Sequence, residues 1–123
     1  MKTLATGVDL VEISRVRWAI ERQGEKFLHR IYTAQELEQV GKNIDSLAVR
    51  FAAKEAVSKA LGCGIGDVSW QEIEILRDDL DAPELRLHGA ALQKAGLLGL
   101  HSWSVSLSHT NSHAIAMVVA IGD

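Results

Sequence analysis

The chain of 123 residues is 47% hydrophobic and 24% charged, which is typical of one globular domain spanning residues 1–123. Its formal net charge of −3 argues against general nucleic-acid binding, and its longest apolar run, Ala114–Ile121, is too short to cross a bilayer. The single cysteine, Cys63, excludes an internal disulfide and fits a reducing compartment. No charged segment precedes an apolar run, so we expect no signal peptide and a cytoplasmic protein without a membrane partner.

Patterns in the first half of the chain predict one strand and three helices. Residues Thr3–Ile13 read as a strand, and apolar residues at spacings of three and four then predict a helix from Ser14 to Gly24. The segment Thr33–Glu36 has the form of a capping box, which predicts a short helix over residues 34–40. The alanine-rich segment Leu47–Leu61 predicts a longer helix.

The second half is dominated by strand patterns. In order, it predicts a strand over 68–76, an acidic turn over 78–83, a return strand around Leu85 and Leu87, a helix over 89–98, and strands over 103–107 and 114–121 joined by a turn at 110–112. The element order β-α-α-α-β-β-α-β-β predicts an α+β fold, a small single domain with an antiparallel sheet packed against the long helix.

Two charges on the long helix are the first candidate for a functional site. At about 100° per residue, Glu55 and Lys59 fall on the same strip as Ala48 and Ala52, so small neighbours would let a ligand come close. A surface Glu–Lys pair four residues apart, worth a few tenths of a kcal/mol (roughly 0.2–0.5) to the helix, explains the same spacing. The spacing alone favours the surface pair.

A glycine cluster follows this helix and has two interpretations. Backbone N–H groups around Gly62, Gly64 and Gly66 would be able to converge on an anion beside Lys59. The lysine precedes the glycines, however, so this is not a Walker A loop. Gly62 alone is also explained as a helix C-cap.

Asp9 is the second candidate, because a carboxylate between Val8 and Leu10 in an apolar strand needs a partner. A divalent metal ion is one such partner. Alternatively, Asp9 and Glu12 have the spacing of a capping box for the first helix. The pattern does not separate these two interpretations.

Two further segments favour simpler explanations. Residues 14–30 hold five basic and two acidic side chains, which suits either a solvated helix face or a local acidic partner, and composition favours the solvated face. In Ser106–His109, neighbouring side chains point to opposite faces of a strand and no strained glycine elbow is present. A serine hydrolase is therefore disfavoured, and a surface hydrogen bond is the common fate of such a histidine.

Four segments in the right order resemble the holo-[acyl-carrier-protein] synthase family of small 4′-phosphopantetheinyl transferases: Gly7–Val16, Arg30–Thr33, Arg50–Gly62 and Ser106–His109. The chain departs from the family in the turn before Pro83, where it lacks the usual Gly-Lys. The resemblance implies a 4′-phosphopantetheinyl transferase-like fold. It also implies Mg²⁺-dependent transfer of the phosphopantetheine arm of coenzyme A to a serine of apo acyl carrier protein, supporting fatty acid biosynthesis.

The resemblance also implies roles for individual residues. Asp9 and Glu55 would hold Mg²⁺, and either Glu55 or a metal-bound water would act as the base. Lys59 would neutralise phosphate charge, with Arg50 and Lys54 as weaker phosphate ligands.

The remaining expectations concern the nucleotide, the assembly and the carrier. Gly62 and Gly64 would pass close to the nucleotide, and His109 would reach it from a neighbouring subunit of a homotrimer. Because acyl carrier proteins are acidic, the basic segment becomes an expected docking surface, with these residues: Arg15, Arg22, Lys26 and Arg30.

Two other classes of function fit parts of the same pattern. A non-catalytic module for coenzyme A or nucleotides would keep Lys59 and the glycines without needing Asp9. An interaction domain for an acidic partner would need only the basic segment. Turnover in the presence of Mg²⁺ distinguishes an enzyme from both.

Overall fold

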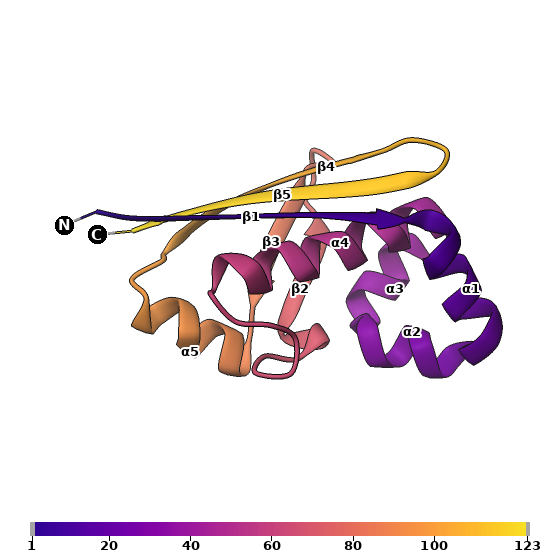
Figure 1. Ribbon diagram of the computed structural model, residues 1–123, viewed down its shortest axis with the longest axis horizontal. Coiled ribbons are helices and arrows are strands. Elements are labelled where there is room, and N and C mark those ends of the chain that lie inside the picture. Colours follow the sequence, from indigo (N-terminus) through magenta and orange to yellow (C-terminus); the bar gives the residue numbers. More distant parts are fainter. Residues whose placement is uncertain (1, 123) are drawn as a thin grey trace.

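Within residues 2–122, which the computed structural model describes, three antiparallel strands form the sheet that organises the fold (Figure 1). β1 (Thr3–Glu12) pairs along its full length with β5 (His113–Gly122), and β4 (Ser102–His109) pairs with the other edge of β5. The strand order is therefore β1-β5-β4, with the last strand in the chain at the centre of the sheet.

The long helix α4 (Ile44–Ala60) packs against this sheet, helices gather at its two ends, and a two-stranded hairpin crosses its middle (Figure 1). Helices α1 (Ile13–Gln23), α2 (Glu25–Ile31) and α3 (Ala34–Val40) surround the beginning of α4. Beyond the end of α4 the chain continues as a 3-10 turn η1 (Trp70–Glu72), a hairpin of β2 (Ile73–Arg77) and β3 (Pro83–Leu87), and α5 (Gly89–Leu97). These elements confirm the predicted fold class, an α+β fold with an antiparallel sheet against a long helix.

Small residues let β1 approach α4 very closely. Ala52, Ala56 and Ala60 are all buried in α4, and Gly7 faces them from β1. A Cβ built on Gly7 would lie 1.9 Å from the carbonyl oxygen of Ala56, so no other residue fits without a shift of backbone. This contact brings the middle of β1 against the second half of α4.

On the face of the sheet that points away from α4, β1 and β5 expose apolar side chains. We call it the outer sheet face; its exposed apolar residues are Leu4, Val8 and Leu10 of β1 and Ile115, Met117 and Ile121 of β5. These side chains are between 39% and 68% exposed. A contiguous apolar surface of this kind on a small protein indicates an interaction site.

The predicted elements differ from the structure in three places: one helix was missed, and two elements begin at other residues. Helix α2 was missed, because Gly24, with φ of 58°, ends α1 and begins α2 without an intervening loop. Helix α4 begins at Ile44, where the side chain of Asn43 caps it, rather than at Leu47. The strand predicted from Val68 begins only at Ile73, after η1. The capping box of Thr33 and Glu36 is confirmed.

None of the helices in the described residues combines the length and the apolar character that a bilayer span requires.

Candidate active site

Asp9, Glu55 and Lys59 come together where β1 crosses α4. Asp9 lies on the same face of β1 as Gly7, so its side chain points towards α4 and is only 19% exposed. The Nζ of Lys59 lies 3.0 Å from Oδ1 of Asp9 and donates a second hydrogen bond, also 3.0 Å, to the carbonyl oxygen of Val8. Glu55 is one turn before Lys59 on the same side of the helix.

The cluster contains two negative carboxylates, Asp9 and Glu55, and one positive ammonium, Lys59. Burial raises the pKa of Glu55, the negative charge of Asp9 raises it further, and the ammonium of Lys59 opposes both effects. Within residues 2–122, no group of three or more His, Cys, Asp or Glu side chains forms a metal cage. Two carboxylates fit Mg²⁺, which takes few protein ligands and completes its shell with water or substrate phosphates.

The alternative interpretation of Asp9 as a helix cap is wrong. The N-cap of α1 is Glu12, and no side chain caps its backbone. Asp9 lies inside β1, directly opposite Ala116 of β5. Its partner in the structure is the ammonium of Lys59.

The glycine cluster ends α4 in a Schellman motif. The N–H of Gly62 donates to the carbonyl of Lys59, the N–H of Cys63 donates to that of Ser58, and Gly62 has the left-handed φ of 72°. The C-cap interpretation of Gly62 is thus confirmed. The N–H groups of Gly62 and Cys63 already donate to helix carbonyls, so they are not available to bind an anion. Gly64 has open space around it and leaves room beside the loop.

The prediction that Lys54 binds phosphate is wrong. Its side chain is fully buried, and its three N–H donors go to Glu36, Trp70 and Ile73. One residue in a helix turns the side-chain direction by about 100°, so the neighbour of Glu55 points into the core instead of the site.

Arg50 is also buried, and it donates to the carbonyl oxygens of Ser46 and Ile75. It additionally lines an open cavity of about 320 Å³ between β3 and β4, together with Pro83 and Leu107. A role for Arg50 at a nucleotide therefore stays a prediction, and the cavity is where such a role would be exercised.

His109 does not join the other site residues within one chain. Its ring lies 4.0 Å from the carboxylate of Asp45, near the start of α4. Glu55 is ten residues further along the helix, a distance of about 15 Å at 1.5 Å per residue. A contact between His109 and a site of this kind would require a second subunit.

The basic residues of α1 and α2 are exposed, and one of them lines an apolar cavity. Arg15 lines this cavity of about 200 Å³, whose walls include Phe27 and Phe51. Arg22 lies over the ring of Trp18 at 4.8 Å, and Trp18 itself is 59% exposed. The charges were predicted from the sequence but these aromatic residues were not, although an exposed tryptophan among arginines is a signal for a binding surface.

Comparison with known proteins identifies the family. A family model described as the 4′-phosphopantetheinyl transferase superfamily matches residues 5–118. Holo-[acyl-carrier-protein] synthase of Herpetosiphon aurantiacus is 48% identical over 126 aligned residues, covering 97% of this chain and 99% of that protein. The protein of the same name from Dehalococcoides mccartyi is 50% identical over 117 residues, covering 95% of this chain and 98% of that protein.

Solved structures agree with this assignment. Helicobacter pylori holo-[acyl-carrier-protein] synthase in complex with coenzyme A matches with a TM-score of 0.85 at 35% identity, over 94% of this chain and 98% of that one. The Neisseria meningitidis enzyme matches with the same TM-score at 38% identity, over 94% and 96% of the two chains. The chain therefore belongs to the 4′-phosphopantetheinyl transferases, and among them to the holo-[acyl-carrier-protein] synthases. The resemblance found in the motifs is confirmed.

Proposed function

We propose that this enzyme transfers the 4′-phosphopantetheine arm of coenzyme A to a serine of apo acyl carrier protein, in the cytoplasm and for fatty acid biosynthesis. The observation that carries the proposal is the convergence of Asp9, Glu55 and Lys59 from distant parts of the chain. The Helicobacter pylori relative, described in complex with coenzyme A, supports the choice of donor.

In this proposal Asp9 and Glu55 hold Mg²⁺. The bound ion supplies charge neutralisation at the pyrophosphate of coenzyme A. The serine oxygen of the carrier forms a bond to the phosphorus next to pantetheine, and the phosphoanhydride bond breaks to release adenosine 3′,5′-bisphosphate. The carboxylate of Glu55 is our candidate to take the serine proton, and Lys59 lies beside it to compensate the charge of the departing phosphate.

The carrier would dock on α1 and α2. Arg15, Arg22, Lys26 and Arg30 offer positive charge to an acidic protein, and the cavity beside Arg15 offers an apolar surface at the same place. Arg15 follows β1 by only a few residues, so a carrier bound there would present its serine close to Asp9.

A homotrimer is the assembly we propose. The outer sheet face is apolar over two strands, which supports burial against other copies of the chain. His109 is exposed and lies far from Glu55 along α4, so a neighbour's site is the place where it would act. Gly62 and Gly64 follow the helix that carries Lys59, and they would border the nucleotide there.

One assay tests the reaction. The protein is incubated with coenzyme A, Mg²⁺ and an apo acyl carrier protein, and the carrier is weighed by mass spectrometry. We expect the carrier to gain the mass of one phosphopantetheine arm, and to gain nothing when coenzyme A or Mg²⁺ is omitted. Binding of coenzyme A without any transfer would instead support a non-catalytic binding module and overturn the proposal.

A further inference from the structure

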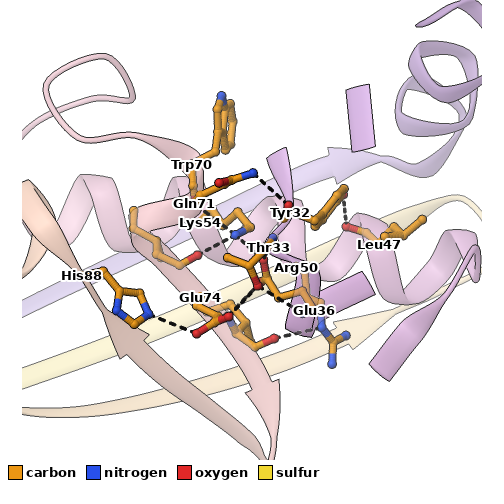
Figure 2. Close-up of polar contacts among 12 residues, drawn as sticks. Tyr32, Thr33, Glu36, Leu47, Arg50, Lys54, Trp70, Gln71, Glu74 and His88 are labelled. Carbon is orange, nitrogen blue, oxygen red and sulfur yellow. Dashed lines mark hydrogen bonds and ion pairs between the residues drawn. The ribbon is translucent and has the colours of Figure 1, made fainter. Parts of the chain in front are cut away.

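A buried ion pair lies on the side of α4 that faces away from the candidate active site. Figure 2 shows Lys54 in the middle of a set of polar contacts that join α3, α4 and β2. Its Nζ lies 2.8 Å from Oε1 of Glu36, 3.0 Å from the carbonyl oxygen of Trp70 and 2.6 Å from that of Ile73. Both charged side chains have no exposed surface, so every donor of the ammonium has a fixed direction.

Glu36 is held just as firmly. Its Oε1 also accepts a hydrogen bond of 2.9 Å from the backbone N–H of Thr33, and its Oε2 accepts one of 2.9 Å from the N–H of Ile75. These two hydrogen bonds fix the carboxylate to the start of α3 and to β2 independently of Lys54. Lys54 therefore anchors α4 to two other elements.

Arg50 adds a second contact on the same side of α4. It is one turn before Lys54, and its Nε donates to the carbonyl oxygen of Ile75 at 3.2 Å. Arg50 and Lys54, at positions i and i+4 of α4, consequently donate hydrogen bonds to neighbouring carbonyl groups of β2. Contacts at two points along one helix face fix its rotation about its own axis as well as its distance.

The apolar packing of α4 is less directional than these polar contacts. Its buried surface combines Leu47, Val49 and Val57 with alanines, of which Ala48, Ala52, Ala53 and Ala56 are all at 0% exposed. Gly7 of β1 packs closely against one side of it. Methyl groups of equal size on several sides leave few ridges that interlock in one orientation only. In some proteins a buried polar group selects one packing arrangement over others, and the contacts of Lys54 have the directions that such a role needs.

The rotation matters because Glu55 directly follows Lys54. A rotation of α4 by about 20° would move a side-chain tip some 6 Å from the helix axis by about 2 Å. Such a shift would separate Glu55 and Lys59 from Asp9, which is held by the strand pairing of β1. We propose that the ion pair of Lys54 and Glu36 is a positioning device that sets the rotation of α4 and thereby aims Glu55 and Lys59 at Asp9. This inference rests on the proposed function, in which Asp9, Glu55 and Lys59 form the active site.

The test compares Lys54→Met, which keeps most of the length of the side chain and removes its donors, with Leu100→Ala. Leu100 is buried in the core beyond the end of α4, so its truncation lowers stability without touching the ion pair. Both variants are studied at a temperature where circular dichroism shows them fully folded. The readouts are Mg²⁺ affinity by calorimetry, kcat, the KM for the carrier, and a crystal structure.

We expect Lys54→Met to weaken Mg²⁺ binding and lower kcat by about 10–100-fold, as seen when supporting partners of metal ligands are lost, with an unchanged KM for the carrier. Its crystal structure should show Nζ of Lys59 beyond 4 Å from Asp9. Leu100→Ala should keep the affinity, kcat and ion pair of the wild type. If Lys54→Met does not fold, the same measurements on Glu36→Gln test the positioning role of the ion pair.

Two outcomes would overturn the inference. The first is a folded variant with wild-type Mg²⁺ affinity and kcat; the second is an unchanged contact between Lys59 and Asp9. The crystal structure of the variant tests the positioning role separately from the proposed function. If wild-type protein transfers nothing to the carrier, the reaction is wrong, whereas the effect of Lys54 on the rotation of α4 is still measured directly.

Discussion

Lys59 and Asp9 are 50 positions apart in the chain, and their side chains meet at 3.0 Å across the junction of α4 and β1. Asp9→Asn keeps the size of the side chain but removes one of the two charges proposed to hold Mg²⁺. We expect the fold to persist and transfer to fall by at least about 100-fold, because one carboxylate alone holds the ion poorly. Initial rates measured against Mg²⁺ concentration check this. Asp79→Asn, in an exposed turn, is the control. Full activity of Asp9→Asn would exclude the metal assignment.

Gly7→Ala should destabilise the protein, because the new methyl group would lie 1.9 Å from the carbonyl oxygen of Ala56 and backbone must move. Overpacking of this kind costs about 1–3 kcal/mol. The matched control is Gly64→Ala, since no heavy atom lies within 4 Å of a Cβ at that position. Denaturant unfolding of both variants gives the comparison. Equal midpoints would show that β1 and α4 are not in the close contact described.

Arg15→Glu should raise the KM for the carrier by about tenfold or more, and leave the KM for coenzyme A unchanged. The substitution removes an attraction for an acidic partner and adds a repulsion, and both effects weaken with salt. Saturation curves at low and raised salt measure this. Arg86→Glu makes the same charge change on β3, away from the basic helices. An identical carrier curve for Arg15→Glu would leave the basic surface without a docking role.

Met117→Glu should break the proposed trimer, because it places a charge in the centre of the outer sheet face. Sedimentation should give a trimer mass for wild type and a lower mass for the variant. Leu97→Glu, on α5, changes an apolar residue that is 86% exposed and lies off this face, so it should not alter the mass. A monomeric wild type would refute the trimer outright.

The hydrogen bonds of Glu72 should make the free energy of unfolding depend on pH. Its carboxylate accepts hydrogen bonds from the N–H groups of Ser69 and Ala90, and these bonds lower its pKa below the usual value of 4.5. A lowered pKa means that the carboxylate stabilises the fold above about pH 4.5 and that this stabilisation is lost as the pH falls through the lowered pKa.

Glu72→Gln should therefore be less stable than wild type at pH 7, and the difference should shrink at pH 3. Urea unfolding midpoints at both values measure it. Glu38→Gln, at an exposed position of α3, provides the control. A difference that stays constant with pH would mean that the charge of Glu72 contributes nothing.

The sequence predicted which residues gather at the candidate site better than it predicted how they are brought together. The helical period groups Glu55 with Lys59, and the family motifs add Asp9. No local pattern shows that β1 crosses α4 on that side. The close contact of Gly7 with Ala56 decides it, and a glycine inside a strand only hints at such an approach.

Lys54 illustrates the limit of carrying roles over from motifs. The resemblance implied a phosphate ligand at Lys54, whereas its partner is Glu36, eighteen residues earlier. Glu36 was correctly interpreted as part of a capping box, and that local role concealed its second role as the buried partner of an ammonium. Pairings across the core of this kind are not written in any short stretch of sequence.

The pairing of Thr3 with Gly122 has a consequence for how the protein is made. β5 is the central strand of the sheet, so β1 leaves the ribosome early and has no strand to pair with until almost all of the described chain has been synthesised. Helices depend on local contacts and form much sooner than pairings between distant segments. We expect α4 and the helices around it to form before the sheet closes. Pulse-labelled hydrogen exchange during refolding would test this order, and protection of β1 amides before those of α4 would contradict it.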